Sequence, residues 1–226
     1  MKDETVTKPF DLSDQYWGGL SAEHQALYLL VRPQPKATYA MDNGLPRVEN
    51  FINEQTDAMR EMGGVFELEP DFQRGHVWSD DQRKGYVEAL LRATAPINIL
   101  FNCPGWSRSD GGEGDIPRYT LQCIDGLQRL TAVRKFIAGE LTVFNGLKAA
   151  DLKGSPFDIR KYYLKFSVYE FNSKAQLLQF YLDLNGGGTI HPQSELDRVR
   201  RLLDQAQTMS ALAVVQSPVG DHPAPR

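Results

Sequence analysis

The chain has 226 residues, a formal net charge of −4, and apolar and charged fractions of 41% and 24%, as in an ordinary soluble protein. It is long enough to bury a hydrophobic core without disulfides, and its charge argues against a protein that coats nucleic acid through bulk positive charge. No apolar run approaches the roughly 20 residues that span a bilayer, and the N-terminus lacks a signal-peptide pattern. We therefore expect a cytoplasmic protein without a membrane partner.

The N-terminal part, residues 1–47, is expected to be an arm with one short helix. Residues 1–20 are polar and close with two glycines, whereas Ala22–Val31 carries apolar residues that favour a helix. Prolines and an Asn-Gly pair then predict an irregular break before the compact domain. We place that domain at residues 48–209 and expect a flexible, proline-containing tail at 210–226.

From residue 48 the pattern alternates between helix-like and strand-like segments. Apolar residues at helical spacing, or a Ser followed three residues later by Gln, predict helices at 48–62, 79–91, 126–138, 173–184 and 194–209. Runs of β-branched and aromatic residues predict strands at 65–68, 97–101, 118–124 and 164–171. The sequence therefore predicts an α+β fold, with a small mixed sheet flanked by helices and extra helices at the N- and C-terminal ends.

The cysteines offer no metal site. Cys103 and Cys123 are the only two in the chain, and neither belongs to a C-x-x-C pair or lies at zinc-ligand spacing from a histidine. We expect two reduced, partly buried thiols, with an isolated disulfide as the alternative. Residues 103–117, rich in Gly, Ser, Asp and Pro, are expected to form a mobile surface loop.

Three short stretches hold polar residues where core packing alone would not place them. They are Phe72–Trp78 (FQRGHVW), Ile124–Ala132 (IDGLQRLTA) and Leu184–Ile190 (LNGGGTI). The first follows a predicted strand, the second joins a predicted strand to a helix, and the third is a glycine-rich turn. We therefore regard these three stretches as the candidate functional site.

The strand-to-helix junction carries the clearest chemistry. Gly126 lets a ligand approach the backbone, and the new helix offers unpaired N–H groups to an anion. Arg129 can bind phosphate oxygens, Gln128 can position a water molecule, and Asp125 suits magnesium coordination. The alternative is that Asp125 is only a helix cap with Arg129 as its ion-pair partner.

The other two stretches also have plain structural explanations. Gln73 and Arg74 can be polar residues at the end of a strand, and a glycine-rich turn on its own is a weak phosphate signal. His76 and His191 lie at no recognisable metal spacing. The chain has no P-loop, no nucleophile elbow and no zinc finger, which excludes those classes by motif.

Taken together, the stretches resemble the N-terminal domain of GmrSD-type DNA restriction enzymes. The shared patterns are F-Q-R-x-x-V-W, D-G-x-Q-R-L-T-A and L-N-x-G-G-T followed by E-L, in the family's order, between about Val48 and Leu203. The family has the ParB/sulfiredoxin-like fold and a D-G-Q-Q-R signature, whose third position here is Leu127, which removes one hydrogen-bonding group. The spacing of Gly126, Arg129 and Ala132 is also similar to the phosphate-binding motif of ParB proteins.

The resemblance implies a domain that binds and hydrolyses a nucleoside triphosphate with Mg²⁺. By matched position, Asp125, Gln128 and Arg129 are the expected catalytic residues, with Asp125 also the metal ligand. The remaining expected nucleotide-binding positions are Gln73, Arg74, Gly126, Thr131, Asn185, Gly186 and Gly187.

The resemblance also sets the expected partners. They are a nucleoside triphosphate, DNA directly or through a partner, a nuclease subunit or another restriction-system protein, and, as an option, a second copy in a homodimer. Full-length relatives carry a C-terminal His-Asn-His nuclease domain that does not fit in this chain, so we expect a sensor, a subunit or a fragment. Two alternatives remain open: a non-hydrolysing DNA- or protein-binding regulatory module of the same fold, or a ParB-like metal-dependent endonuclease. The resemblance implies a role in DNA restriction or phage–host DNA metabolism.

Overall fold

The structure is a computed structural model that describes residues 8, 12–73, 78–107, 114–186 and 193–216, without the side chains of 186, 193–195 and 210–216. The chain divides into two compact units, residues 1–36 and 37–226. The first unit holds α1 (Asp14–Gly18) and α2 (Ala22–Val31), each capped by a serine side chain. The edge of Trp17 packs against Tyr28 with ring centroids 6.2 Å apart. The helix expected at Ala22–Val31 is confirmed, whereas α1 was not predicted.

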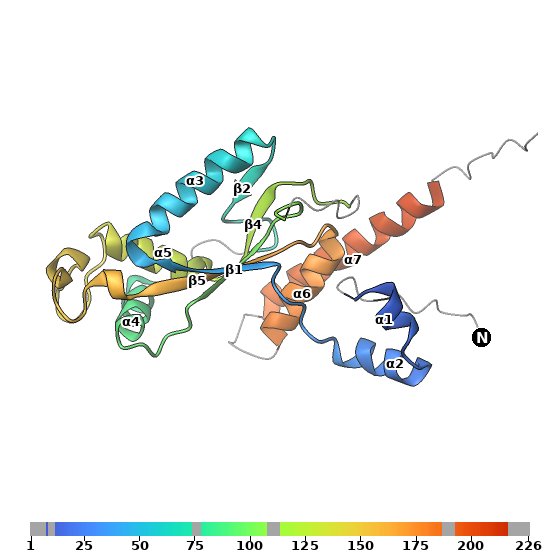
Figure 1. The fold of residues 1–226 in the computed structure, drawn as a ribbon, viewed down its shortest axis with the longest axis horizontal. Helices are drawn as coiled ribbons and strands as arrows, with labels where there is room; N and C mark the ends of the chain where they lie inside the picture. Colours follow the sequence, from blue (N-terminus) through green and yellow to red (C-terminus); the bar gives the residue numbers. More distant parts are fainter. Residues whose placement is uncertain (1–7, 9–11, 74–77, 108–113, 187–192, 217–226) are drawn as a thin grey trace, which may run out of the picture. The chain divides into compact units, whose positions relative to one another are not determined.

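The second unit is built on a five-stranded mixed sheet of order β1-β5-β3-β4-β2 (Figure 1). Its strands are β1 (Tyr39–Gly44), β2 (Val65–Glu67), β3 (Asn98–Asn102), β4 (Thr120–Asp125) and β5 (Tyr163–Tyr169). The β1/β5 and β3/β4 pairs are antiparallel, whereas the β3/β5 and β2/β4 pairs are parallel. This arrangement leaves β1 and β2 at the two edges of the sheet.

The sequence predicted an irregular break after Ala22–Val31, but the structure has the edge strand β1 within it. Tyr39–Gly44 pairs with β5 residue by residue, although it contains the Asn-Gly pair that suggested a turn. Only Asn43 among its residues is buried, so the strand shows almost no apolar alternation. Its position is set by backbone pairing at the sheet edge, which leaves little trace in the side-chain pattern.

Helices flank the sheet. The longer helices of this unit are α3 (Val48–Glu61), α4 (Asp80–Leu91), α5 (Leu127–Ile137), α6 (Lys174–Gly186) and α7 (Gln193–Gln216). Short 3₁₀ segments lie at Leu45–Arg47, Ala149–Leu152 and Ile159–Lys161. All five predicted helices are present; α6 extends two residues past Leu184, and α7 extends past Met209. The predicted α+β fold, with a mixed sheet and additional helices at both ends, is confirmed.

Two hydrophobic cores lie on opposite sides of the sheet. Ile99 and Phe101 belong to the core that contains α3, α4 and α5, whereas Leu100 between them packs on the core of α6 and α7. Since successive strand residues point to opposite faces, the two cores cover the two faces of the sheet. In β4 the same alternation sends Cys123 to the first core and Ile124 to the second. The end of β4 is therefore held firmly from both sides.

Candidate functional site

The junction between β4 and α5 is a tight turn that requires glycine. Gly126 has φ +97°, and a Cβ added there would lie 2.6 Å from the Cδ1 atom of Ile99 and 3.1 Å from the Asn98 carbonyl oxygen. Gly126 is also the N-cap residue of α5, and no side chain caps this helix end. The first-turn N–H groups of α5 are therefore left without a side-chain cap, the arrangement that suits an anion.

Asp125 and Arg129 form an ion pair one helical turn apart, between Oδ2 and Nη2. The Arg129 side chain is only 15% exposed, whereas that of Asp125 is 43% exposed. The alternative from the sequence was that Asp125 caps the helix and pairs with Arg129. The ion pair is present, but the carboxylate does not cap the helix. The geometry presents a half-exposed carboxylate beside a guanidinium that is held in place.

The F-Q-R-x-x-V-W stretch is hydrogen bonded to the end of β4 and to the start of α5. The Gln73 side-chain amide donates to the Cys123 carbonyl at 2.6 Å, and the Trp78 backbone N–H donates to Gln128 Oε1 at 3.2 Å. Arg74 lies outside the described residues. The first two stretches are therefore neighbours in space, as the candidate site requires.

The third stretch is connected to the first through the contact between the Tyr181 and Phe72 rings. Asn185 and Gly186 belong to the last turn of α6 and not to a loop, and Gly187 lies outside the described residues. The Asn185 amide donates to the Tyr181 carbonyl at 2.7 Å, and the Tyr181 ring lies 5.6 Å from that of Phe72, the neighbour of Gln73. Asn185 is thus connected to the first stretch, although no described contact joins it to Asp125 or Arg129.

Thr131 differs from the other predicted residues. Its hydroxyl donates to the Leu127 carbonyl at 2.8 Å, within α5. It also lines a separate cavity of about 420 Å³ with Glu49, Arg134 and Lys135. Thr131 therefore faces a different part of the surface from the β4–α5 turn.

Tyr86, which the sequence analysis did not single out, packs against Trp78 of the first stretch. The rings of Trp78 and Tyr86 lie 5.6 Å apart, and the Tyr86 hydroxyl donates to the Pro96 carbonyl at 2.9 Å. Burial raises the pKa of Tyr86 to about 12, and the positive charge of Arg129 acts on the same hydroxyl in the opposite direction. Tyr86 is thus connected to the turn through Trp78, whose N–H donates to Gln128, and no sequence motif indicates this contact.

Arg83 is a buried charged residue that the sequence analysis did not single out. It lies on α4, its side chain is 11% exposed, and its Nη1 atom donates to Asp80 at 2.8 Å. Its buried Nε has no hydrogen-bond partner within the described parts of the chain. A charged residue in the first turns of a helix is usually solvated, so its burial left no signal in the sequence.

The chemistry of the turn is compatible with a magnesium–nucleotide complex. No group of three or more His, Cys, Asp or Glu side chains that could hold a metal occurs among the described residues. Mg²⁺ commonly uses one or two carboxylates together with phosphate oxygens and water, and the half-exposed Asp125 fits that requirement. Asp125 would then contribute one ligand, and a bound phosphate would contribute others.

The cysteines contribute no reactive group to the site. Both Cys103 and Cys123 are buried free thiols, which confirms the expected reduced state. Burial is the main reason that the pKa of each rises to about 12, with Glu170 adding to the effect at Cys103 and Asp125 at Cys123. Neither thiol is therefore a nucleophile near neutral pH.

Comparisons with known proteins identify one family. A family model described as GmrSD restriction endonuclease, N-terminal domain, matches residues 48–209, which is more than half of the chain. No curated protein and no solved structure matches the chain. Within the described residues, no helix is long and apolar enough to cross a membrane.

Proposed function

Because this chain belongs to the GmrSD restriction endonuclease N-terminal domain family, with the role in DNA restriction that membership implies, we propose that it binds and hydrolyses a nucleoside triphosphate at the β4–α5 turn. One combination of features carries the proposal. The N-terminus of α5 has no side-chain cap, the turn before it requires a glycine at position 126, and Arg129 is fixed there by its ion pair with Asp125. Phosphate oxygens would bind the first-turn N–H groups and the Arg129 guanidinium.

Further roles are proposed for the neighbouring residues. Asp125 would hold Mg²⁺ against the phosphates, because its carboxylate is the more exposed member of the ion pair. Gln128, whose Oε1 atom is fixed by the Trp78 N–H, would orient the attacking water. Gln73, Arg74, Asn185, Gly186 and Gly187 are proposed to form the surrounding walls, with DNA and a nuclease subunit or a second copy of the chain as partners.

Binding can be tested with a pair of arginines on the same helix. Arg129→Ala should weaken triphosphate affinity by about 1.5–3 kcal/mol, the scale of hydrogen bonds to a charged group. Arg134→Ala is the matched control, because Arg134 also lies on α5 but pairs with Glu49 outside the turn. Isothermal calorimetry with each nucleotide would measure both, and equal affinities for the two variants would remove Arg129 from the site.

Hydrolysis can be tested at Asp125. Asp125→Asn keeps the shape of the side chain but removes the charge that would hold Mg²⁺, so phosphate release should fall on the order of a hundredfold. Triphosphate binding without metal should not weaken, because the carboxylate repels phosphate. Circular dichroism would verify folding, and an unchanged rate in the folded variant would eliminate the catalytic role.

One observation favours a second candidate, a non-hydrolysing regulatory module that binds DNA or protein. Asp125 is already occupied by Arg129, so the pair could serve only to fix the turn. In that case the wild-type protein would release no phosphate from any nucleoside triphosphate, with or without DNA, while still binding its partner.

A further inference from the structure

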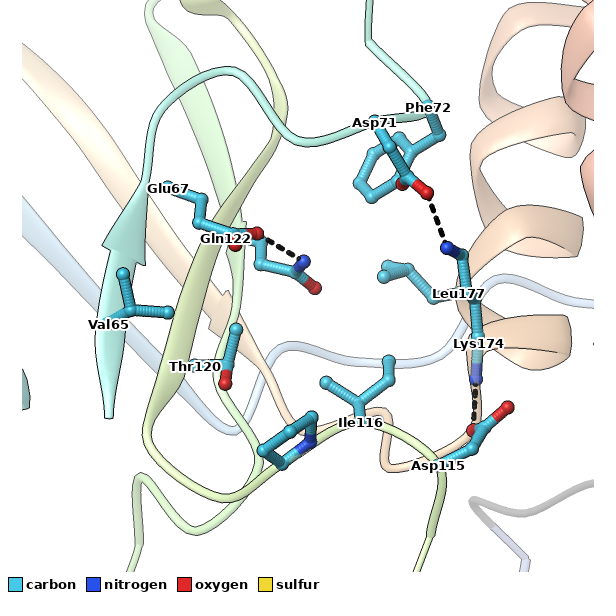
Figure 2. Close-up of a pocket in the computed structure, with 11 residues that line it drawn as sticks. Val65, Glu67, Asp71, Phe72, Asp115, Ile116, Thr120, Gln122, Lys174 and Leu177 are labelled. Carbon is cyan, nitrogen blue, oxygen red and sulfur yellow. Dashed lines mark hydrogen bonds and ion pairs between the residues drawn. The ribbon is translucent and has the colours of Figure 1, made fainter. Parts of the chain in front are cut away.

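A cavity of about 230 Å³ lies between the β2–β4 edge of the sheet and the start of α6 (Figure 2). None of the residues that line it belongs to the β4–α5 turn, and Phe72 is the only one of them that lies in a stretch of the candidate site. It faces the second core, because Phe72, Ile116 and Leu177 form part of its wall. The cavity therefore contains none of the proposed catalytic residues, Asp125, Gln128 and Arg129, and has its own chemistry.

A buried acceptor points into this cavity. The Gln122 Nε2 atom donates to Glu67 Oε2 at 2.7 Å, which fixes the orientation of the amide, since the reverse orientation would bring two acceptor oxygens together. The Oε1 atom of Gln122 is then directed toward the open space, as Figure 2 shows. It is buried and has no hydrogen-bond partner in the described portion of the chain. Such an acceptor is costly to leave unsatisfied, so the cavity favours a ligand that donates.

The charges around the cavity favour a cation. Asp71 is paired with the Lys174 ammonium, and Asp115 accepts from the Lys174 backbone N–H at 2.7 Å. Together with Glu67 the lining carries three carboxylates against one ammonium, a formal charge of −3 + 1 = −2. A phosphate-bearing ligand would be repelled here, whereas a positively charged donor would be attracted.

The volume and the apolar wall of the cavity fit a ligand of the size of one amino-acid side chain. A volume of about 230 Å³ is below the roughly 300–1,000 Å³ of pockets that hold drug-sized molecules, but above the about 150 Å³ that holds benzene. Phe72 and Leu177 are each 1% exposed and provide an apolar wall. An arginine combines an aliphatic stem that can lie on such a wall with a planar group that carries several N–H donors.

We propose that this cavity binds the guanidinium group of an arginine side chain presented by a partner protein. The guanidinium donates to the Glu67 carboxylate and to Gln122 Oε1, and its stem lies along Phe72 and Leu177. A protein segment is the fitting source because β2 is the last strand of the sheet in the described part of the chain, and Val65 of β2, which lines the cavity, is 45% exposed. An extended segment that pairs with the edge strand β2 could place its arginine in the cavity.

The ligand chemistry is tested with two small probes and one peptide. Nα-acetyl-arginine amide should bind the folded protein saturably, with a dissociation constant on the order of millimolar for so few contacts. Nα-acetyl-citrulline amide, which has the same shape without the charge, should bind at least about tenfold more weakly. A short Val/Thr peptide with one central arginine should bind at least about tenfold more tightly than the amide, because it adds the strand contacts.

Variants then place the binding in this cavity. Gln122→Met and Glu67→Gln should each weaken the arginine probe at least about tenfold. The matched control is Glu54→Gln, the same change of charge at an exposed position of α3. Thermal melting would show that each variant is folded. No saturable binding, equal binding of arginine and citrulline, or unaffected Gln122 and Glu67 variants would overturn the proposal, and a peptide no tighter than the amide would exclude a partner protein as the source.

Discussion

Replacing Gly126 with alanine tests how closely the β4–α5 turn is packed. A residue with a Cβ in the left-handed conformation that φ +97° demands costs about 1–2 kcal/mol. The new methyl group would also lie 2.6 Å from Ile99 Cδ1 and 3.1 Å from the Asn98 carbonyl oxygen. Ile99 is completely buried and the second atom is backbone, so neither can easily yield, and overpacking adds about 1–3 kcal/mol. We expect Gly126→Ala to lower the free energy of unfolding by about 2–5 kcal/mol.

The matched control is Gly139→Ala. Gly139 has φ +76°, but an added Cβ would meet nothing within 4 Å, so only the conformational cost of about 1–2 kcal/mol applies. Urea denaturation followed by circular dichroism would give both values, and their difference isolates the steric contribution. If the two variants agreed within about 0.5 kcal/mol, the neighbours of Gly126 would be yielding and the reasoning from close packing would be refuted.

Two further predictions concern buried polar groups. Asn102 is fully buried, and its side-chain amide donates to the Phe171 carbonyl at 3.0 Å and accepts from the Phe171 N–H at 2.7 Å. Asn102→Ala should lower the free energy of unfolding, measured with urea, by about 1–3 kcal/mol for each of these hydrogen bonds. A decrease below about 1 kcal/mol would mean that water replaces the amide. Because the folded-state pKa of Cys103 and Cys123 is raised from 9.0 to about 12, their neutral thiols stabilise the fold fully below pH 9, and this contribution is lost as pH rises from 9 to 12. At pH 8 a disulfide reagent should label the native protein at least about a hundredfold more slowly than the unfolded chain, and rapid native labelling would show that the thiols are accessible.

The parts of the fold that the sequence predicts are those with a local cause. Ser79 and Gln82 form both hydrogen bonds of the capping box at the start of α4, as their spacing indicates. In α3 the residues at helical spacing, Val48, Ile52 and Met59, are buried in the first core. Strand β1 has no such local cause, because its backbone pairs with β5 while its side chains are mostly exposed or half-buried.

In the candidate site, too, the features with a local cause could be predicted from the sequence, and those that depend on distant contacts could not. The turn of Gly126 follows from the sequence, since a glycine between a strand and a helix has a local conformational reason. The contact of Trp78 with Gln128 joins residues far apart in sequence and depends on the packing of α4 beside α5. Thr131 lies two positions after Arg129 on α5 and lines the cavity of Glu49 and Arg134, so its role in nucleotide binding stays a prediction. The Glu67–Gln122 pair belongs to no motif, and only the pairing of β2 with β4 brings it together.

Leu127, at the third position of the D-G-x-Q-R motif, removes one hydrogen-bonding group relative to the D-G-Q-Q-R signature. The structure gives the residue another role, because Leu127 is 3% exposed and packs in the first core. Leu127→Gln should therefore not raise phosphate release, and burying the amide should lower the free energy of unfolding by about 1–3 kcal/mol. Steady-state phosphate release and urea denaturation on the same preparation would measure both. Faster release with unchanged stability would contradict this reasoning, since it would mean that the glutamine turns out of the core and reaches the nucleotide.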